Sequence, residues 1–325
     1  MSENLLEVRN LVKHFTLNGD LISRIAGKRQ TLKAVDDISF HIRAGETLGL
    51  VGESGCGKST TGRLITRLIE PSSGNIEVKG QDLLTFSGAQ MRELRKTIQL
   101  VFQDPYASLN PRKTIMQILE RPLEIHNLTA DWISRRERVL ELLNLVGLGR
   151  EHIDRYPHEF SGGQRQRIAI ARALAVDPEL VIGDEPVSAL DVSVQAQILN
   201  LFRELQESFS LTYLFIAHDL SVVRHISDRV AVMYVGKIVE TGPVQAIFTQ
   251  PQHPYTNALL AAVPEPDIAK PPPKLTLQGE VATPIDPPPG CRLKGRCPLA
   301  TEQCGSQSPE LREVAPAHMV ACHNI

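Results

Sequence analysis

The feature that most constrains the fold is a glycine-rich segment near the start of the chain. It reads Gly52-Glu53-Ser54-Gly55-Cys56-Gly57-Lys58-Ser59. The spacing matches G-x-x-x-x-G-K-[ST], and the segment lies between the strand-like TLGLV and the helix-like STTGRLI, as a phosphate-binding loop requires. Glycines let the backbone turn its N–H groups toward phosphate oxygens, and the following helix adds its positive end. The sequence therefore predicts a nucleoside-triphosphate site.

The residue types of this loop predict separate roles. We expect the ammonium of Lys58 to reach the β- and γ-phosphates and the hydroxyl of Ser59 to bind Mg²⁺. The remaining loop residues, together with Thr60 after it, are expected to contact the nucleotide. Cys56 is interpreted as a small residue that fills space in the loop.

A second element with nucleotide chemistry lies downstream. The apolar run Leu180 to Gly183 ends in two acidic residues, Asp184 and Glu185. Asp184 fits the acid that supports Mg²⁺ at the end of a buried strand, and Glu185 is placed to orient or deprotonate an attacking water. Taken alone, the pair is equally typical of a solvated strand end, but together with the phosphate loop it favours hydrolysis.

Apolar runs and helix-like stretches alternate along the body of the chain, which indicates an α/β body with a largely parallel sheet. The expected strands cover residues 98–102, 180–183 and 211–217. The expected helices cover residues 59–69, 135–146 and 164–174. Residues 230–242 have the pattern of a hairpin that turns at Gly236–Lys237. No internal repeat of the body is found, so we expect one such unit.

The segment Phe160-Ser161-Gly162-Gly163-Gln164 resembles the signature motif of ATP-binding-cassette (ABC) ATPases. Phe160 stands where leucine is commoner, an apolar exchange that leaves the SGGQ residues intact. The resemblance implies that this helix start faces the ATP held by the other subunit of a dimer, with one chain supplying half of each site.

The resemblance extends over residues 1–260 and implies further site residues. Gln103 resembles the Q-loop glutamine that senses Mg²⁺ and water, and Asp191 lies in a segment similar to the D-loop. His218 resembles the switch histidine that contacts the γ-phosphate. Phe15 resembles the aromatic residue that stacks on adenine, although the insertion at 18–31 leaves its register open.

The family resemblance also implies a fold and a mechanism. The fold is a P-loop NTPase domain with a RecA-like core, an N-terminal antiparallel β region and a helical subdomain at about 104–165. Two cassettes close on two ATP molecules, and hydrolysis reopens them. All expected catalytic and Mg²⁺-supporting residues are present, so an active site is predicted: Lys58, Ser59, Gln103, Asp184, Glu185 and His218.

The segment after the cassette indicates the branch of the family. Residues 251–256, PQHPYT, and the tail PIDPPPGCRLKGRCPLATEQC are similar to those of oligopeptide and dipeptide importers, closest to the second ATPase subunits of dipeptide importers. This implies a paralogous ATPase, two transmembrane permeases and a periplasmic binding protein as partners. Importers of glutathione or nickel, and a cassette of a soluble phosphonate-degrading complex, remain alternatives.

The C-terminal part is expected to be a proline-rich linker, 261–290, followed by a cysteine region, 291–325. Cys291, Cys297, Cys304 and Cys322 follow the pattern C-x5-C-x6-C-x17-C, without the C-x2-C spacing of common zinc sites. Related importer subunits imply a [4Fe–4S] cluster with a structural role; zinc and free thiols remain open.

Composition restricts the remaining classes. The chain has 42% hydrophobic and 22% charged residues, which are ordinary values for a globular protein. Its single uninterrupted cassette and net charge of -2 argue against a cassette that works on nucleic acid. No stretch approaches the ~20 apolar residues that cross a bilayer, and the first residues lack a secretory leader. The resemblance implies a peripheral protein on the cytoplasmic face of a bacterial inner membrane.

Overall fold

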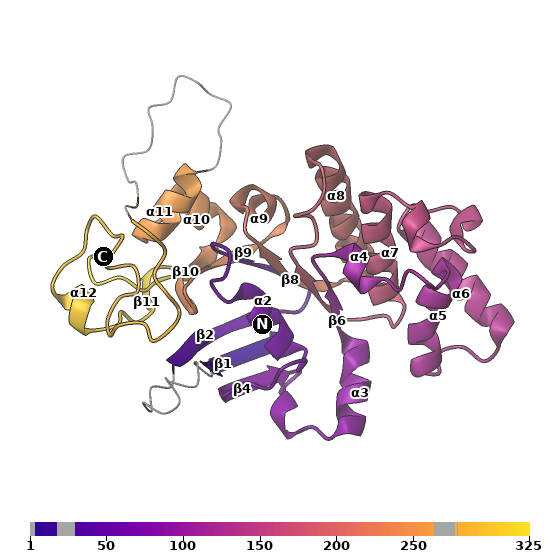
Figure 1. Ribbon diagram of the computed structural model, residues 1–325, viewed down its shortest axis with the longest axis horizontal. Helices are drawn as coiled ribbons and strands as arrows, with labels where there is room; N and C mark the ends of the chain where they lie inside the picture. Colours follow the sequence, from indigo (N-terminus) through magenta and orange to yellow (C-terminus); the bar gives the residue numbers. More distant parts are fainter. Residues whose placement is uncertain (1–3, 18–29, 263–276, 278) are drawn as a thin grey trace. The chain divides into compact units, whose positions relative to one another are not determined.

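A computed structural model describes residues 4–17, 30–262, 277 and 279–325. These residues form two compact units (Figure 1). The described residues of the first unit fall within 1–5, 43–46 and 85–216, and those of the second within 6–42, 47–84 and 217–325.

The first unit alternates helices with parallel strands, as the apolar runs predicted. Its strands are β6 (Ile98–Val101), β7 (Leu180–Asp184) and β8 (Thr212–Ala217). Its helices are α3 (Gly88–Thr97), α4 (Pro105–Ser108), α5 (Ile115–Ile125), α6 (Trp132–Leu145), α7 (Gly162–Leu174) and α8 (Val192–Phe209), with 3-10 turns at Arg150–His152 and Pro157–Glu159.

The three strands of the first unit pair in parallel. In register, Ile98 lies opposite Leu180, which lies opposite Thr212 on the far side. All of β7 and β8 is buried, as expected for a sheet covered on both faces. Because parallel strands end at the same edge, the segments that follow β6 and β7 are brought together, and these carry Gln103 and Glu185.

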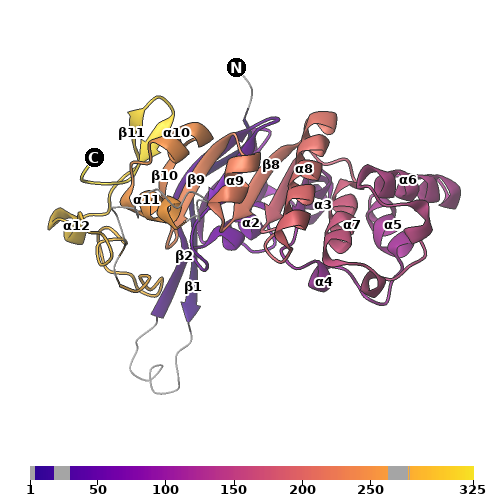
Figure 2. The same cartoon turned by 90° about the horizontal axis from the view of Figure 1, so that it is seen from above.

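Helices α5, α6 and α7 pack against one another (Figures 1 and 2). The sequence specifies where α5 and α6 begin, because Thr114 and Asp131 each accept a hydrogen bond from the backbone N–H three residues on. Their buried faces are apolar and include Ile118, Leu119 and Leu142. A helical region is thus present between residues 104 and 165.

The second unit contains the remaining strands and helices. Its strands are β1 (Asn4–Leu17), β2 (Gln30–Arg43), β3 (Thr47–Val51), β4 (Ser73–Val78), β5 (Gln81–Asp82), β9 (Arg229–Tyr234), β10 (Lys237–Pro243), β11 (Arg312–Ala315) and β12 (His318–Val320). Its helices are α2 (Lys58–Ile65), α9 (Leu220–Ile226), α10 (Val244–Thr249), α11 (Pro254–Ala261) and α12 (Gln303–Ser306), and a 3-10 turn, Leu83–Thr85, lies at its boundary.

The long strands β1 and β2 belong to a four-stranded sheet of order β2-β1-β4-β5 (Figure 1). β3 pairs in parallel with β9, and β9 forms the predicted hairpin with β10. The hairpin turns at Val235 and Gly236, with φ of 41° and 79°. Two consecutive positive φ angles match the right-handed twist of a tight hairpin, although a β-branched residue such as Val235 rarely adopts one.

The C-terminal segment adds to this second unit. β12 pairs antiparallel with β10, and β11 pairs with β12. Part of the expected linker 261–290 lies outside the described residues, as does most of the insertion 18–31. The described end of the linker is hydrogen-bonded to β2. The backbone N–H of Asp286 donates to the carbonyl of Thr31, and the backbone N–H of Lys33 donates to the carbonyl of Pro284. Residues 284–286 are therefore attached to the body of the unit.

The predicted strands and the hairpin are confirmed, and the predicted helices differ at their ends. The expected helix 59–69 begins at Lys58 and ends at Ile65, followed by Arg67 with a positive φ of 48° that a helix cannot continue. Among the described residues no helix is both long and apolar enough to cross a bilayer.

Candidate functional site

The phosphate loop connects buried β3 to α2, as predicted. Gly55 and Gly57 have φ of 79° and 112°, which disfavour residues with a side chain. A Cβ on Gly57 would lie 2.1 Å from the carbonyl oxygen of Ala34, and one on Gly52 would lie 2.1 Å from that of Met233. The loop therefore packs so closely on β2 and β9 that glycine is required at both positions.

Lys58 at the start of α2 is folded back over this loop. Its buried ammonium donates to the carbonyl oxygens of Gly52 at 2.7 Å and Glu53 at 3.0 Å. Ser59 and Thr60 follow in the first helical turn, where backbone N–H groups have no intrahelical acceptor. The loop is thus preformed, with the cation that a phosphate would use already in place.

Cys56 is buried inside the loop, 4% exposed. Its thiol lies 3.9 Å from the ammonium of Lys58. Burial raises the pKa of the thiol, against the opposing influence of the Lys58 charge. Cys56 is therefore a neutral group that fills space in the loop.

The second predicted element has its acids at the end of β7. Asp184 is 3% exposed, whereas Glu185 leaves the strand with a positive φ of 48°. The backbone N–H of Glu185 donates to the carbonyl of Ile216 on the next strand at 3.0 Å. This bond holds a strained backbone at a position where sequence predicts a functional carboxylate.

Gln103 contacts Glu185 directly. The amide nitrogen of Gln103 lies 3.1 Å from the Oε2 carboxylate oxygen of Glu185 and 3.4 Å from the hydroxyl of Ser188. Ser188 in turn donates to the Glu185 carbonyl at 3.0 Å. The sequence predicted Gln103 and Glu185 as separate site residues, and the structure brings them into one hydrogen-bonded group.

The signature segment forms the start of α7. Ser161 is exposed at the N-cap and accepts from the backbone of Gln164 at 3.3 Å, while the Gln164 side chain accepts from Ser161 at 3.0 Å. Gly163 is buried against α8, where a Cβ would lie 2.4 Å from the Cγ1 atom of Val194. Gly162 lies between them at the first position of the helix.

Three other predicted residues lie at the ends or on the face of elements. Asp191 is exposed at the start of α8 and makes no capping hydrogen bond there. His218 is exposed between β8 and α9. Phe15 is half-buried on β1, with the ammonium of Lys13 at 4.9 Å from its ring centroid. These placements leave the three side chains accessible to a ligand.

The predicted site residues divide between the two units. The second unit holds the phosphate loop, Phe15 and His218, and the first holds Gln103, Asp184, Glu185, Asp191 and the signature segment.

Two residues at the phosphate loop were missed by sequence reasoning. The hydroxyl of Tyr255 accepts the backbone N–H of Glu53 at 2.8 Å, and the guanidinium of Arg296 binds the Glu53 carboxylate at 2.9 Å. Tyr255 belongs to the PQHPYT segment and Arg296 to the cysteine region. No local pattern links residues so far apart in sequence.

No disulfide joins the four C-terminal cysteines, and their side chains influence one another. Burial raises the pKa of Cys291, and the charges of Cys304, Cys297 and Cys322 raise it further. The Cys291 backbone donates to the carbonyl of Cys304 at 2.8 Å. The thiols are therefore neighbours, but in the described part of the chain no group of three or more His, Cys, Asp or Glu side chains is arranged to hold a metal ion.

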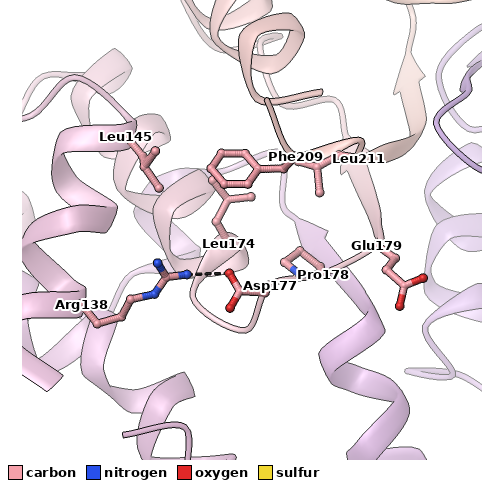
Figure 3. A pocket seen from close by; sticks show the side chains of 8 residues that line it. All are labelled: Arg138, Leu145, Leu174, Asp177, Pro178, Glu179, Phe209 and Leu211. Carbon is pink, nitrogen blue, oxygen red and sulfur yellow. Dashed lines mark hydrogen bonds and ion pairs between the residues drawn. The ribbon is translucent and has the colours of Figure 1, made fainter. Parts of the chain in front are cut away.

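A cavity of about 180 Å³ opens elsewhere in the first unit (Figure 3). Leu145, Leu174 and Phe209 line one side, and an ion pair of Arg138 with Asp177 closes another at 2.5 Å. The cavity also touches Glu179, which precedes β7, and therefore lies at the opposite end of this strand from Asp184. It is separate from the predicted nucleotide residues.

A larger groove of about 780 Å³ runs along α5 in the first unit. Ser108, Asn110, Lys113, Gln117 and Arg172 are among the polar residues that line it. Its upstream edge, at Ser108 and Asn110, lies in the segment 104–111 that follows Gln103.

Two family profiles match the chain. The ABC transporter profile matches residues 35–188, and the profile of the C-terminal region of oligopeptide/dipeptide transporters matches residues 239–304. The first includes the phosphate loop, Gln103, the signature segment and Glu185, and the second includes Tyr255, Arg296 and three of the four C-terminal cysteines.

Solved structures of cassette proteins share the fold. The dimeric cassette MJ0796 bound to ADP and Pi is similar with a TM-score of 0.65 and 28% identity, over 74% of this chain and 98% of that one. CbiO1 of Clostridium perfringens, part of the transporter complex cbiONQ, is similar with a TM-score of 0.63 and 28% identity. The similarity covers 76% of this chain and 92% of that one. The predicted ABC ATPase fold is confirmed.

Curated relatives match nearly the whole chain. The oligopeptide transport ATP-binding protein AppF of Bacillus subtilis is 54% identical over 99% of this chain and 97% of its own length. The dipeptide transport ATP-binding protein DppF of Haemophilus influenzae is 51% identical over 99% and 97%. The di/tripeptide transport protein DppF of Pseudomonas aeruginosa is 49% identical over 99% and 98%. The chain therefore belongs to the ABC transporter family, among the ATP-binding proteins of oligopeptide and dipeptide transport.

Proposed function

We propose that this protein is the ATP-hydrolysing subunit that powers import of dipeptides and oligopeptides across the bacterial inner membrane. In this proposal it works as a dimer with a homologous ATPase, on the cytoplasmic face of two permease subunits that receive substrate from a periplasmic binding protein. Full-length similarity to peptide-transport ATPases and the match to their C-terminal region support it.

The phosphate loop binds the triphosphate in this proposal. The ammonium of Lys58 exchanges its bonds to the Gly52 and Glu53 carbonyls for charge-assisted bonds to phosphate oxygens, which are stronger. The first N–H groups of α2 add donors for the same anion. Ser59, Gln103 and Asp184 would hold Mg²⁺, which when bound would supply charge neutralisation for the phosphoryl group.

The observation that carries the proposal is the contact of Gln103 with Glu185. Glu185 acts as the general base for the attacking water, and Gln103 keeps its carboxylate at the end of the sheet. His218 contacts the γ-phosphate, and Phe15 stacks on the adenine. Hydrolysis is then mainly positioning and charge neutralisation.

A single chain holds only half of each catalytic site in this proposal. Ser161 and the start of α7 face the ATP bound to the partner ATPase, and Asp191 lies near the dimer contact. The exposure of Ser161 and Asp191 supports this role. The capping bonds between Ser161 and Gln164 prepare the helix end, so its N–H groups are oriented before a phosphate arrives.

The permeases contact residues 104–111 and the groove along α5 in this proposal. Tyr106 is 65% exposed and is stacked on the guanidinium of Arg165 at 3.6 Å, which presents an aromatic surface of the kind enriched in interfaces.

The proposed domains of the chain are a cassette over 1–260, with its helical part near 104–165, a linker over 261–290 and a cysteine region over 291–325.

Reconstitution tests the proposed transport function. The chain is co-expressed with two permeases and a second ATPase of a dipeptide importer, purified in detergent and placed in proteoliposomes that contain ATP. We expect uptake of a labelled dipeptide in the presence of the binding protein, and none with Glu185→Gln. Recovery of the chain only in a water-soluble complex without permeases would contradict the proposal, and uptake of Ni²⁺ or glutathione instead would correct the substrate.

We further propose that Cys291, Cys297, Cys304 and Cys322 hold a [4Fe–4S] cluster. The mutual influence of the four thiols supports their grouping, and soft thiolates suit iron–sulfur chemistry. Such a cluster supplies a covalent staple for a region with little apolar core of its own. Leu293 and Cys304 are its main buried apolar side chains before β12.

The metal content of protein purified without oxygen tests the cluster. We expect about four irons and four acid-labile sulfides per chain, lost in Cys297→Ser. Zinc without acid-labile sulfide would show that the cysteines hold a structural zinc ion and no iron–sulfur cluster. If the protein contains neither metal nor sulfide, the four cysteines are free thiols and the proposed cluster is wrong. The proposed ATPase function would be unaffected.

A further inference from the structure

The segment between Cys291 and Cys297 contacts the phosphate loop through its last arginine. Two nitrogens of the Arg296 guanidinium bind the carboxylate of Glu53: Nη1 lies 2.9 Å from Oε2 and 3.2 Å from Oε1, and Nη2 lies 3.2 Å from Oε1. The two side chains are 13% and 28% exposed. A forked, partly buried pair of this kind is stronger and more directional than a pair on the surface.

The backbone of Glu53 is also held in place. The N–H of Glu53 donates to the hydroxyl of Tyr255 at 2.8 Å, and Tyr255 is fully buried. The ring of Tyr255 packs on that of Tyr234 with centroids 4.6 Å apart, and the Arg296 guanidinium lies 5.9 Å from the Tyr234 ring. Tyr255 and Arg296 therefore form one packed group around Glu53.

Arg292 attaches the same segment to the neighbouring hairpin. It donates to the carbonyl of Val235 in the hairpin turn and to the carboxylate of Asp36, and its side chain is 7% exposed. The next residue of the turn, Gly236, donates its N–H to the Cys56 carbonyl of the phosphate loop at 2.7 Å. The cysteine segment is thus connected to the loop at Glu53 and, through the hairpin turn, at Cys56.

We propose that Arg296 is a positioning residue for ATP binding, through which the cysteine region holds the phosphate loop in its binding geometry. The inference rests on the proposed nucleotide site. Glu53 places a carboxylate in a loop built for an anion, and Arg296 both neutralises it and directs it away from the phosphates. Without Arg296, the charge of Glu53 repels the triphosphate and the loop must be ordered on binding.

A double-mutant cycle on ATP affinity tests this inference. Equilibrium binding of a fluorescent ATP analogue with Mg²⁺ is measured on the full-length chain. We expect Arg296→Ala to weaken binding by about fivefold to tenfold, and Arg296→Lys to weaken it less, because lysine keeps the charge but not the fork. Lys294→Ala, an exposed cation of the same segment, is the matched control and should bind like the unaltered protein.

The second arm of the cycle identifies the route of the effect. In a Glu53→Ala background, Arg296→Ala should change the affinity by less than about twofold, because no carboxylate remains to be held. An equal loss in both backgrounds would show that Arg296 acts only on folding, and would overturn the inference. So would normal affinity of Arg296→Ala.

The outcomes separate this inference from the proposed function. If the unaltered chain fails to bind ATP, the proposed function fails. If it binds ATP and Arg296→Ala binds equally well, the ATPase assignment stands and the positioning role is lost. Thermal unfolding of each variant, measured in parallel, distinguishes a specific loss of affinity from a loss of structure.

Discussion

At the scale of single residues, Lys58 of the phosphate loop already makes hydrogen bonds that a bound nucleotide would replace, and Glu53 makes an ion pair that would persist. The buried ammonium of Lys58 is satisfied by the carbonyls of Gly52 and Glu53, because a buried charge without partners would be costly. The Glu53 carboxylate is satisfied by Arg296. Binding of a triphosphate therefore exchanges hydrogen bonds in a loop that is already folded.

Cys56 gives a chemical probe of this loop. Its thiol is buried and its pKa is raised, first of all by burial, so little thiolate is present near neutral pH. We expect slow reaction with N-ethylmaleimide, slowed further by ATP, and loss of ATP binding after modification. Mass spectrometry of the peptide that contains Cys56 measures the rate.

Cys56→Ser is the control for this experiment, and should bind ATP after the same treatment. A modification rate that ATP does not change would place Cys56 away from the bound phosphates and contradict the site.

Gly163 shows how a signature residue also serves packing. An alanine in a helix interior is ordinarily more stable than glycine by about 1 kcal/mol. At Gly163 the added Cβ would lie 2.4 Å from Cγ1 of Val194, whose branched side chain has little freedom in a helix. We expect Gly163→Ala to lower the free energy of unfolding by about 1–3 kcal/mol in urea denaturation.

Val194→Ala should relieve this clash and restore stability in the double mutant. Gly88→Ala, at a helix start with open space around it, is the matched control. Equal stability of Gly163→Ala and the unaltered protein would contradict the close approach of α7 and α8.

At the scale of elements, α11 is capped by a histidine that is neutral near neutral pH. His253 is 1% exposed, and its Nδ1 atom accepts the backbone N–H of Tyr255 at 3.1 Å, which caps the helix. Burial lowers its pKa from 6.5 to about 4. Below pH 6.5 the unfolded chain therefore binds a proton that the folded chain does not.

The free energy of unfolding should consequently fall as the pH falls from 6.5 toward about 4, and this loss should stop below that value. The full effect is about 3 kcal/mol. Urea denaturation across this pH range measures it, and His253→Asn, which can cap the helix without titrating, should flatten the curve. The same pH dependence in this variant would show that other groups cause it.

The elements that sequence predicted well are those with local patterns. The strands β6, β7 and β8 are short apolar runs, and the phosphate loop carries its own spacing. Helix ends were less predictable: α2 stops at Ile65 although apolar residues continue to Ile69. The stop depends on a backbone angle at Arg67, and side-chain periodicity does not report such angles.

At the scale of the whole molecule, the contacts that sequence could not reveal join distant segments. Glu240 on β10 is fully buried and binds His318 of β12 at 2.7 Å, and it also accepts the backbone N–H groups of Gln252 and His253. No periodicity shows which distant partner will satisfy a buried carboxylate. These bonds attach the C-terminal strands to the hairpin that also contacts the phosphate loop.

More residues of the candidate site than of the contacts around it could be proposed from the sequence, because the site residues belong to motifs. Asp184 is the last residue of its strand, and Gln103, Glu185 and the phosphate loop each follow one, which is where ligands bind in α/β sheets. Tyr255 and Arg296 belong to no such motif, and their proximity to Glu53 arises only when the C-terminal region folds onto the second unit.

The most direct test of the account is the ATPase activity of Glu185→Gln beside the unaltered protein, each assembled with its partner ATPase and permeases. Glutamine keeps the shape and the contact with Gln103 but cannot take a proton from water. We predict that steady-state hydrolysis at this chain's site falls by about 100-fold or more, while equilibrium ATP binding is retained. Unchanged turnover would show that Glu185 is not the general base of this site.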